Sequence, residues 1–201
     1  VNEVICMGLQ AFALSRYAGI CVALKITGDT ADSNAVIDMG LIRPKLVQLN
    51  NPINVHVNRH DPALDREAAS INRRIPASKD FIAKNNINEV MYNPNDKEIG
   101  IIAVGKAATE TIDAFNTIGI KSPHKKGVGL FACKVPWPLI NQEIIEFCKG
   151  YKEIIVIEEK AGIVEEQIAH ILFNDKKRPL LSGKNDAISN DSGTLVNTGQ
   201  I

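Results

Sequence analysis

The sequence predicts an α/β protein with three layers, in which a mainly parallel sheet is covered by helices on both faces. Short apolar runs alternate with helical patterns between residues 99 and 181. The loops between these segments are short, which favours right-handed strand–helix–strand crossovers and hence parallel strands. The composition is ordinary for a globular domain, with 45% apolar and 23% charged residues.

The beginning of the chain predicts a helix followed by a buried strand. Helical spacing of apolar residues covers residues 2–18, and Gly19 ends the pattern. The run at 20–26 is apolar except for one lysine, which is typical of a strand buried on both faces. Residues 27–34 are expected as a polar loop at the end of that strand. Residues 36–57 contain two prolines and are expected as an extended connector.

A second helical pattern follows the connector. Asp61 is a candidate N-cap and Pro62 a candidate first helical residue. Pro76 is expected to kink or end this helix, and a second helical piece reaches about residue 85. Residues 93–96 form a turn cluster and mark the best internal boundary.

Beyond that boundary the pattern becomes regular. Four strands are predicted, at 99–104, 128–133, 154–157 and 179–181. Three helices are predicted between them, at 108–118, 141–148 and 164–172. The tail from residue 182 is polar and is expected as a loop or as disordered.

Charge and hydropathy exclude two classes of partner. The chain has 23 basic and 23 acidic residues, so it lacks the basic surface that nucleic-acid binding requires. No apolar run approaches the roughly 20 residues that a membrane span needs. Because the sequence opens at Val1 inside a helical pattern, we expect it to be a piece of a longer protein.

The cysteines indicate free thiols rather than a metal site. No two of Cys6, Cys21, Cys133 and Cys148 have Cys-x-x-Cys spacing, and each lies among apolar residues. We therefore expect four free thiols, at least three of them buried, and a reducing, cytoplasmic compartment. The histidines are scattered, so neither a catalytic triad nor a metal-ligand set is predicted.

Ligands of open α/β sheets bind at the carboxyl ends of the strands, which gives the first candidates. Gly105 and Lys106 follow a predicted strand, where Gly105 either admits an anion to the next helix or only makes the turn. The phosphate-loop glycine spacing is missing. Trp137, the only tryptophan, lies between two prolines and is either a ligand contact or a cover for a sheet edge or subunit contact.

The other candidates follow the remaining strands. Glu158 and Lys160 end the predicted strand at 154–157, and either support acid–base chemistry or anchor the next loop through a local ion pair. Lys25, Thr27 and Thr30 lie at the end of the predicted strand at 20–26. No catalytic residue and no metal ligand is assigned.

Five segments together resemble one family. They are 13–19 with 22–25, 101–106, 137–139, 156–160 with Glu165 and Gln167, and 183–186. In this order they are similar to the thiamine-diphosphate-dependent 2-oxoacid:ferredoxin oxidoreductases, in particular the indolepyruvate ferredoxin oxidoreductases. The sequence departs from the family at Phe12, where tryptophan is usual, and in its tail.

The resemblance implies a place in a larger enzyme. Residues 1–40 would end the domain that binds the pyrimidine side of thiamine diphosphate, 41–95 would be a connector with a kinked helix, and 96–201 would be a transketolase C-terminal-like domain. The cofactor-activating glutamate, the magnesium site and the iron–sulfur cysteines would lie elsewhere in the protein.

The resemblance also implies an activity for the complete enzyme. Aryl 2-oxoacids would be oxidatively decarboxylated to acyl-CoA, with ferredoxin as the electron acceptor. This piece would be scaffold and would supply one wall of the active-site crevice at residues 25–32, the end of the predicted strand at 20–26. It would be inactive alone, with the enzyme's other domains or subunits as partners and a homo-oligomer as one arrangement. The alternative is a stand-alone α/β binding or subunit-interaction module without redox chemistry.

Overall fold

The computed structural model describes residues 2–38, 40, 44, 46 and 60–184, which form two compact units divided between Asn85 and Asn86. The predicted connector at 36–57, His56 and most of the polar tail lie largely or wholly outside these residues. No helix in the described part is long and apolar enough to cross a bilayer.

The first unit begins with helix α1, Asn2–Ala18, as the apolar spacing predicts. The predicted strand at 20–26 is wrong: these residues form no strand, and most are exposed, with Ile26 45% accessible. A strand exists only when its backbone pairs with a neighbour, and no described segment pairs with this one. The predicted polar loop at 27–34 contains a short helix, α2 (Gly28–Ala31).

A nearly continuous helix completes the first unit. It consists of α3 (Ala63–Ala69), a π-helical turn η1 (Ser70–Arg74) and α4 (Ile75–Lys84). Pro76 was expected to kink or end the helix. The helix does not end at Pro76: the chain stays helical through it, with a π-helical turn immediately before it, where a residue lacking the N–H of the regular ladder is accommodated.

Helix α1 packs against α4 within this unit. The rings of Tyr17 and Phe81 lie 5.4 Å apart, and the Tyr17 hydroxyl donates a hydrogen bond of 3.3 Å to Asp80 Oδ2. Burial, reinforced by Asp80, raises the pKa of Tyr17. Leu14 and Ala18 of α1 are buried, as are Phe81 and Ile82 of α4, so the contact is largely apolar.

The second unit contains a five-stranded sheet in the order β1-β3-β2-β4-β5. The strands are β1 (Glu89–Tyr92), β2 (Ile99–Val104), β3 (Val128–Cys133), β4 (Glu153–Ile157) and β5 (Leu180–Ser182). All neighbouring pairs are parallel except β1 with β3. The four predicted strands and the mainly parallel sheet are confirmed.

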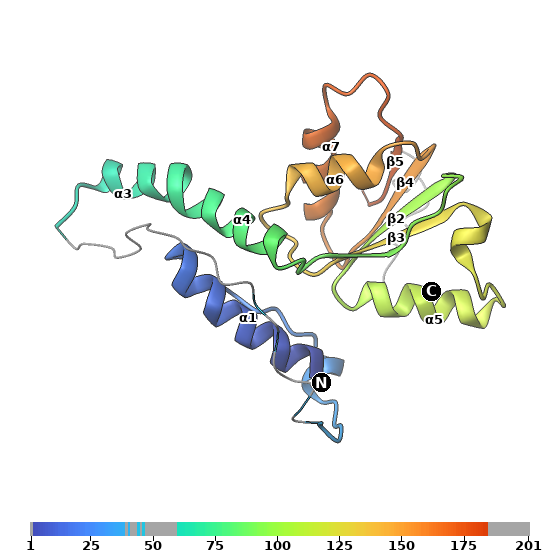
Figure 1. Cartoon of the computed structure of the whole chain (residues 1–201), viewed down its shortest axis with the longest axis horizontal. Helices are drawn as coiled ribbons and strands as arrows, with labels where there is room; N and C mark the ends of the chain where they lie inside the picture. The colour runs from blue at the N-terminus through green and yellow to red at the C-terminus, as the bar shows by residue number, and fades with distance from the viewer. Residues whose placement is uncertain (1, 39, 41–43, 45, 47–59, 185–201) are drawn as a thin grey trace. The chain divides into compact units, whose positions relative to one another are not determined.

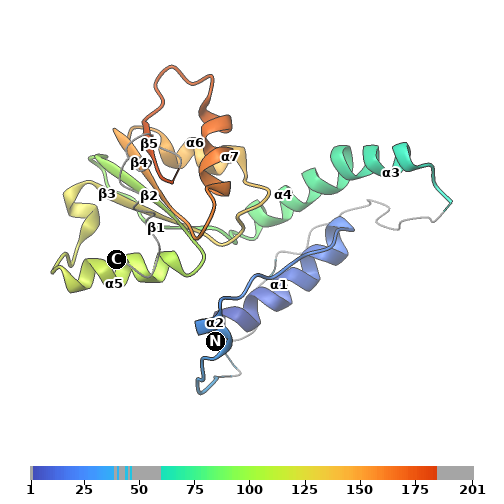
Figure 2. The ribbon, with the colours of Figure 1, turned by 180° about the vertical axis from the view of Figure 1, so that it is seen from behind.

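Helices cover both faces of this sheet, which gives the three predicted layers (Figure 1). Helix α5, Ala107–Thr117, packs on one face, where Ile101, Ala103 and Leu130 are buried. The opposite face carries α6 (Asn141–Cys148) and α7 (Ile163–Leu172) over the larger core, and the view from behind shows the same separation (Figure 2).

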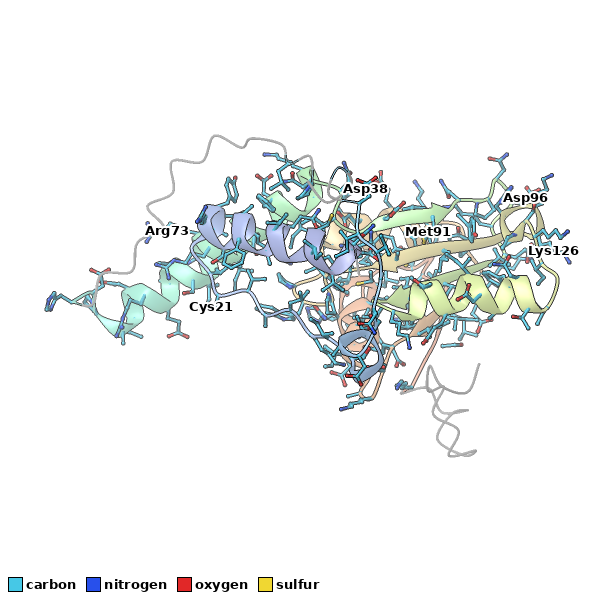
Figure 3. The ribbon with its side chains drawn as sticks, turned by 90° about the horizontal axis from the view of Figure 1, so that it is seen from below. Cys21, Asp38, Arg73, Met91, Asp96 and Lys126 are labelled. Atoms are coloured by element: carbon cyan, nitrogen blue, oxygen red, sulfur yellow. The ribbon has the colours of Figure 1, made fainter. Side chains whose placement is uncertain are left out.

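The sequence analysis did not predict strand β1, and assigned its residues to the segment before residue 96. It is antiparallel to β3 at the edge of the sheet, with Val90 48% and Met91 39% exposed (Figure 3). An edge strand has only one hydrogen-bonded side and little burial, so it shows no clear apolar alternation. The second compact unit accordingly starts at Asn86, upstream of the predicted turn.

Two glycines in the sheet make room for Tyr151, which is 4% exposed. A Cβ on Gly129 would overlap the Tyr151 hydroxyl, and one on Gly100 would lie 3.1 Å from Tyr151 Cδ2. The hydroxyl has no hydrogen-bond partner in the described part of the chain, and burial raises the pKa of Tyr151 to about 12. The ring therefore occupies a slot that only glycine backbone leaves open.

We predict that Gly129→Ala lowers the free energy of unfolding by about 1–3 kcal/mol, because the added methyl overpacks this slot. Gly8→Ala is the matched control, since a Cβ there meets nothing within 4 Å and Gly8 lies inside α1. It should be neutral or stabilise the chain by about 0.5–1 kcal/mol. Urea unfolding of both variants measures the difference, and a neutral Gly129→Ala would contradict the slot.

The thiols differ from the prediction that at least three are buried. None of the four cysteines forms a disulfide, but only Cys133 and Cys148 are buried, whereas Cys6 is half-buried and Cys21 is exposed (Figure 3). Cys21 is exposed because the strand expected to bury it does not form. Burial raises the pKa of the Cys133 and Cys148 thiols to about 12.

We predict two classes of thiol in the native protein. At pH 8 a disulfide reagent such as DTNB should label Cys21 first and Cys6 more slowly, while the buried pair reacts only after denaturation, because both its access and its thiolate fraction are low. Timed labelling followed by peptide mass spectrometry measures this order. Fast native labelling of Cys133 would contradict its burial.

Candidate functional site

The sheet brings three predicted sites to one edge. Strand β2 lies between β3 and β4, with Val104 opposite Cys133 and Ala103 opposite Ile157. The segments that follow these strands, which contain Trp137, Gly105 with Lys106, and Glu158 with Lys160, therefore leave the sheet side by side. The chain path reverses direction between β2 and β4, and such a switch point is where open α/β sheets form ligand crevices.

The loop after β3 is held by Asn88, which is 8% exposed. Asn88 Oδ1 accepts hydrogen bonds of 3.0 Å from the backbone N–H groups of both Lys134 and Val135. Its amide nitrogen donates a 3.0 Å bond to Glu143 Oε2 on α6. Burial raises the pKa of Glu143, whereas the hydrogen bond from Asn88 lowers it. One side chain thus ties the start of the loop to α6.

The far side of the same loop is held by Gln167 of α7. Gln167 Nε2 donates to Pro136 O at 2.8 Å, and Gln167 Oε1 accepts from Leu139 N at 3.2 Å. Trp137 stands between these anchors and is 62% exposed. The fold therefore presents a large aromatic ring to solvent on a loop that is fixed at both ends.

Glu158 fastens the turn after β4 to α7. It is 4% exposed, and its two oxygens accept hydrogen bonds of 2.9 and 3.0 Å from the backbone N–H groups of Val164 and Glu165. These groups lie in the first turn of α7, where N–H groups lack helical partners and carry partial positive charge. Both Glu158 oxygens are thus used within the fold, and Glu158 anchors the next segment through backbone groups. In this turn Lys160 and Ala161 are exposed.

Gly105 and Lys106 open the turn after β2. Gly105 has φ +58°, the left-handed region that favours glycine, and its N–H donates to Cys133 O at 3.0 Å. Lys106 Nζ lies 3.0 Å from Glu110 Oε1, one turn further along α5. The turn alone is sufficient reason for a glycine at position 105.

Lys25, Thr27 and Thr30 belong to the first unit. The hydroxyls of Thr27 and Thr30 share a hydrogen bond of 3.0 Å beside α2, and Lys25 is exposed in the segment after α1. These residues and the sheet edge lie in separate compact units.

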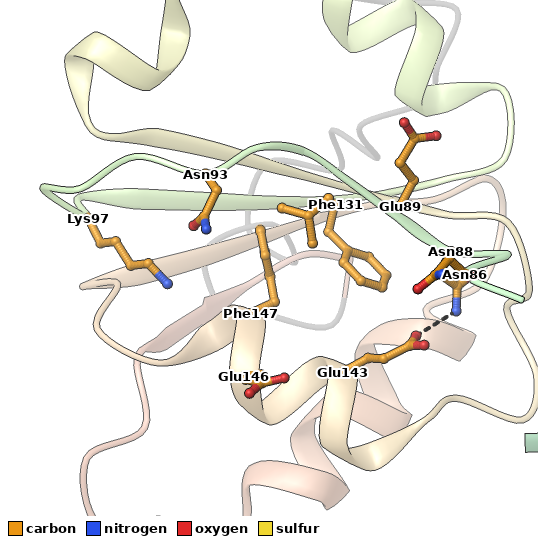
Figure 4. Close-up of a pocket in the computed structure, with 10 residues that line it drawn as sticks. Asn86, Asn88, Glu89, Asn93, Lys97, Phe131, Glu143, Glu146 and Phe147 are labelled. Atoms are coloured by element: carbon orange, nitrogen blue, oxygen red, sulfur yellow. Dashed lines mark hydrogen bonds between the residues drawn. The ribbon is translucent and has the colours of Figure 1, made fainter. Parts of the chain in front are cut away.

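A groove runs between the edge strand β1 and α6 (Figure 4). Its volume is about 640 Å³, the rings of Phe131 and Phe147 line it, and Glu143 and Glu146 border it on the α6 side. Asn88 belongs both to this groove and to the anchor of the Trp137 loop. The sequence analysis predicted neither the groove nor the role of Asn88. The contacts of Asn88 join residues 46 and 55 positions apart, and no local pattern reveals them.

The described residues do not by themselves fit the inorganic groups that the resemblance implies. Within them no three His, Cys, Asp or Glu side chains are placed to hold a metal ion. Magnesium sites are built from oxygen ligands such as carboxylates, and iron–sulfur clusters need several cysteine thiolates. We therefore assign no reaction step through these groups to the described residues.

Comparison with known proteins finds one family. A model described as "Indolepyruvate oxidoreductase domain" matches residues 89–199. An indolepyruvate oxidoreductase subunit IorA from Methanothermobacter marburgensis is 25% identical over 181 residues, which cover 88% of this chain and 28% of the relative. The IorA subunit from Methanothermobacter thermautotrophicus is 25% identical over 167 residues, covering 79% and 25%. The chain thus spans about a quarter of the length of these relatives.

Two solved structures share weaker similarity. A 2-oxoglutarate:ferredoxin oxidoreductase from Magnetococcus marinus is 18% identical with a TM-score of 0.40, covering 70% of this chain and 22% of that one. A structure described as "Split gene transketolase, inactive beta4 tetramer" is 15% identical with a TM-score of 0.39, covering 53% of this chain and 36% of that one.

We predict that Asn88→Ala loosens the Trp137 loop, since two backbone N–H groups lose their acceptor. Trp137 is the only tryptophan, so its fluorescence reports on this loop alone. Its anisotropy should fall and its quenching by acrylamide should rise, with Asn93→Ala, at the other end of the groove, as the control. Equal quenching in the two variants would show that Asn88 does not hold the loop.

Proposed function

The chain belongs to the indolepyruvate oxidoreductase domain family, and from this membership we propose that it is part of a 2-oxoacid:ferredoxin oxidoreductase. The complete enzyme would oxidatively decarboxylate aryl 2-oxoacids of the indolepyruvate type to acyl-CoA and pass the electrons to ferredoxin. We place this enzyme in the cytoplasm, with its remaining domains or subunits as the chain's partners. Thiamine diphosphate, magnesium and the iron–sulfur clusters would be held largely outside the described residues.

One observation carries the proposal. Similarity to the M. marburgensis subunit covers 88% of the chain, more than the second unit can supply, so it extends into the first unit as well. Both units therefore support a single origin in one type of enzyme. An interaction module that had borrowed only the α/β sheet would leave the first unit without similarity to this subunit.

In the proposed enzyme the chain acts as scaffold and as one wall of the active-site crevice. The carboxyl edge of the sheet supplies this wall in place of residues 25–32, whose predicted strand does not form. Trp137, Lys106 and Lys160 are among its exposed side chains. The loops of Trp137 and Lys160 are fixed by Gln167 and Glu158, which bond to backbone groups. Such preorganisation keeps a bound substrate oriented and water excluded without a catalytic group from this chain.

We predict substrate-dependent electron transfer by the complete enzyme. The whole reading frame that encodes this chain, with any companion subunit, is expressed anaerobically and loaded with thiamine diphosphate, magnesium and iron–sulfur clusters. With coenzyme A present, indolepyruvate and phenylpyruvate should reduce ferredoxin or a viologen dye faster than pyruvate or 2-oxoglutarate does. The product of the reaction should be the acyl-CoA.

The 201-residue chain alone is the control and should show no turnover above buffer. Bound thiamine diphosphate and cluster absorbance establish that the complete enzyme is loaded. A loaded enzyme that oxidises no 2-oxoacid would overturn the proposed function. Turnover by the isolated chain would overturn its role as scaffold.

A further inference from the structure

The turn between β4 and α7, residues 158–162, contains a residue in an unfavourable conformation. Lys160 has φ +61°, in the left-handed region that side-chain-bearing residues rarely adopt. Such a conformation persists only when surrounding contacts hold it, and it tends to occur at functional sites. The turn lies at the switch point of the sheet, and Lys160 is exposed there.

The contact that holds Lys160 comes from beyond β5. Lys184 is only 8% exposed, and its Nζ donates a 2.8 Å hydrogen bond to the backbone carbonyl of Lys160. A buried ammonium group is costly unless it is bonded, so this contact is strongly favoured in the folded state. Lys184 therefore clamps the carbonyl of the one residue in the turn that has unfavourable backbone geometry.

The backbone around Lys184 is fixed independently of its ammonium group. Lys184 N donates a 2.7 Å bond to Glu165 Oε2, and Glu165 is itself buried in the first turn of α7. Gly183 passes so close that a Cβ there would lie 2.6 Å from the same Glu165 oxygen. Residues 183–184 are thus seated on α7 before the ammonium group reaches back to Lys160.

We propose that Lys184 is a positioning residue for the crevice wall. Through the Lys160 carbonyl it fixes the turn after β4, and so sets where the Lys160 side chain stands at the carboxyl edge beside the turn of Gly105. This inference rests on the proposed function, which supplies the substrate that the wall would contact. The hydrogen bond from Lys184 Nζ to the Lys160 carbonyl, here called the clamp, can be tested in the chain alone.

The first experiment measures amide hydrogen exchange in the 201-residue chain. Lys184→Met should speed exchange in the turn and at Val164 and Glu165 about tenfold, the effect expected for one lost hydrogen bond to a charged donor. Lys184→Arg keeps a cationic donor and should restore most of the protection. Lys152→Met, an exposed lysine at the other edge of the same sheet, is the control and should change nothing there.

A double variant separates the clamp from general destabilisation. Glycine adopts a left-handed conformation without strain, so Lys160→Gly should make the turn less dependent on Lys184. Lys184→Met should then change exchange in the turn less in that background than in the native one. Equal effects in both backgrounds, or no effect in either, would overturn the clamp.

The second experiment uses the complete, loaded enzyme. Lys184→Met should raise the KM for the 2-oxoacid about tenfold and leave kcat within twofold, because a displaced wall weakens binding. Lys184→Arg should recover most of the native KM, and Lys184→Gln, which keeps a donor without charge, serves if the Met variant fails to fold. A native KM in folded Lys184→Met would overturn the positioning role. A wild-type enzyme without 2-oxoacid oxidation would overturn the proposed function alone, since hydrogen exchange decides the clamp.

Discussion

The parallel pairing of β2 with β3 on one side and β4 on the other is the constraint on which the second unit depends. It buries β2 on both faces, with Ile102 and Ala103 fully enclosed, and divides the apolar side chains into two cores. Because the three strands are in register, their carboxyl ends stop together. The loops that leave them are therefore neighbours for a reason of backbone geometry alone, whatever side chains they contain.

Polar side chains then give this edge a fixed shape. Asn88, Gln167, Glu158 and Lys184 each bond to backbone groups at this edge. Asn88, Glu158 and Lys184 are buried, and burying such groups would be costly without hydrogen-bond partners. The anchors lie on different elements, so the shape of the edge depends on assembly of the unit as a whole.

The sequence predicted the helices and the four parallel strands because their signal, apolar periodicity, is local. It failed at 20–26, since an apolar run shows that a strand could be buried but not that a partner strand lies beside it. It missed β1 because an edge strand such as this one, with Val90 and Met91 exposed, lacks clear alternation. In the candidate site, the parallel topology predicted that the segments after the strands meet. It could not predict Asn88, which contacts the Trp137 loop from 46 residues away.

The left-handed geometry of Lys160 shows why the local sequence does not reveal the site. A side chain in that conformation costs roughly 1–2 kcal/mol, whereas a hydrogen bond from a charged donor contributes about 1.5–3 kcal/mol. The bond from Lys184 therefore offsets the strain, and it comes from a residue that follows β5 and bonds to Glu165 of α7. The shape of the turn is thus a property of the assembled unit and not of its own residues. In the proposed enzyme, where the chain would contribute position rather than reacting groups, this control would keep the crevice wall in one place.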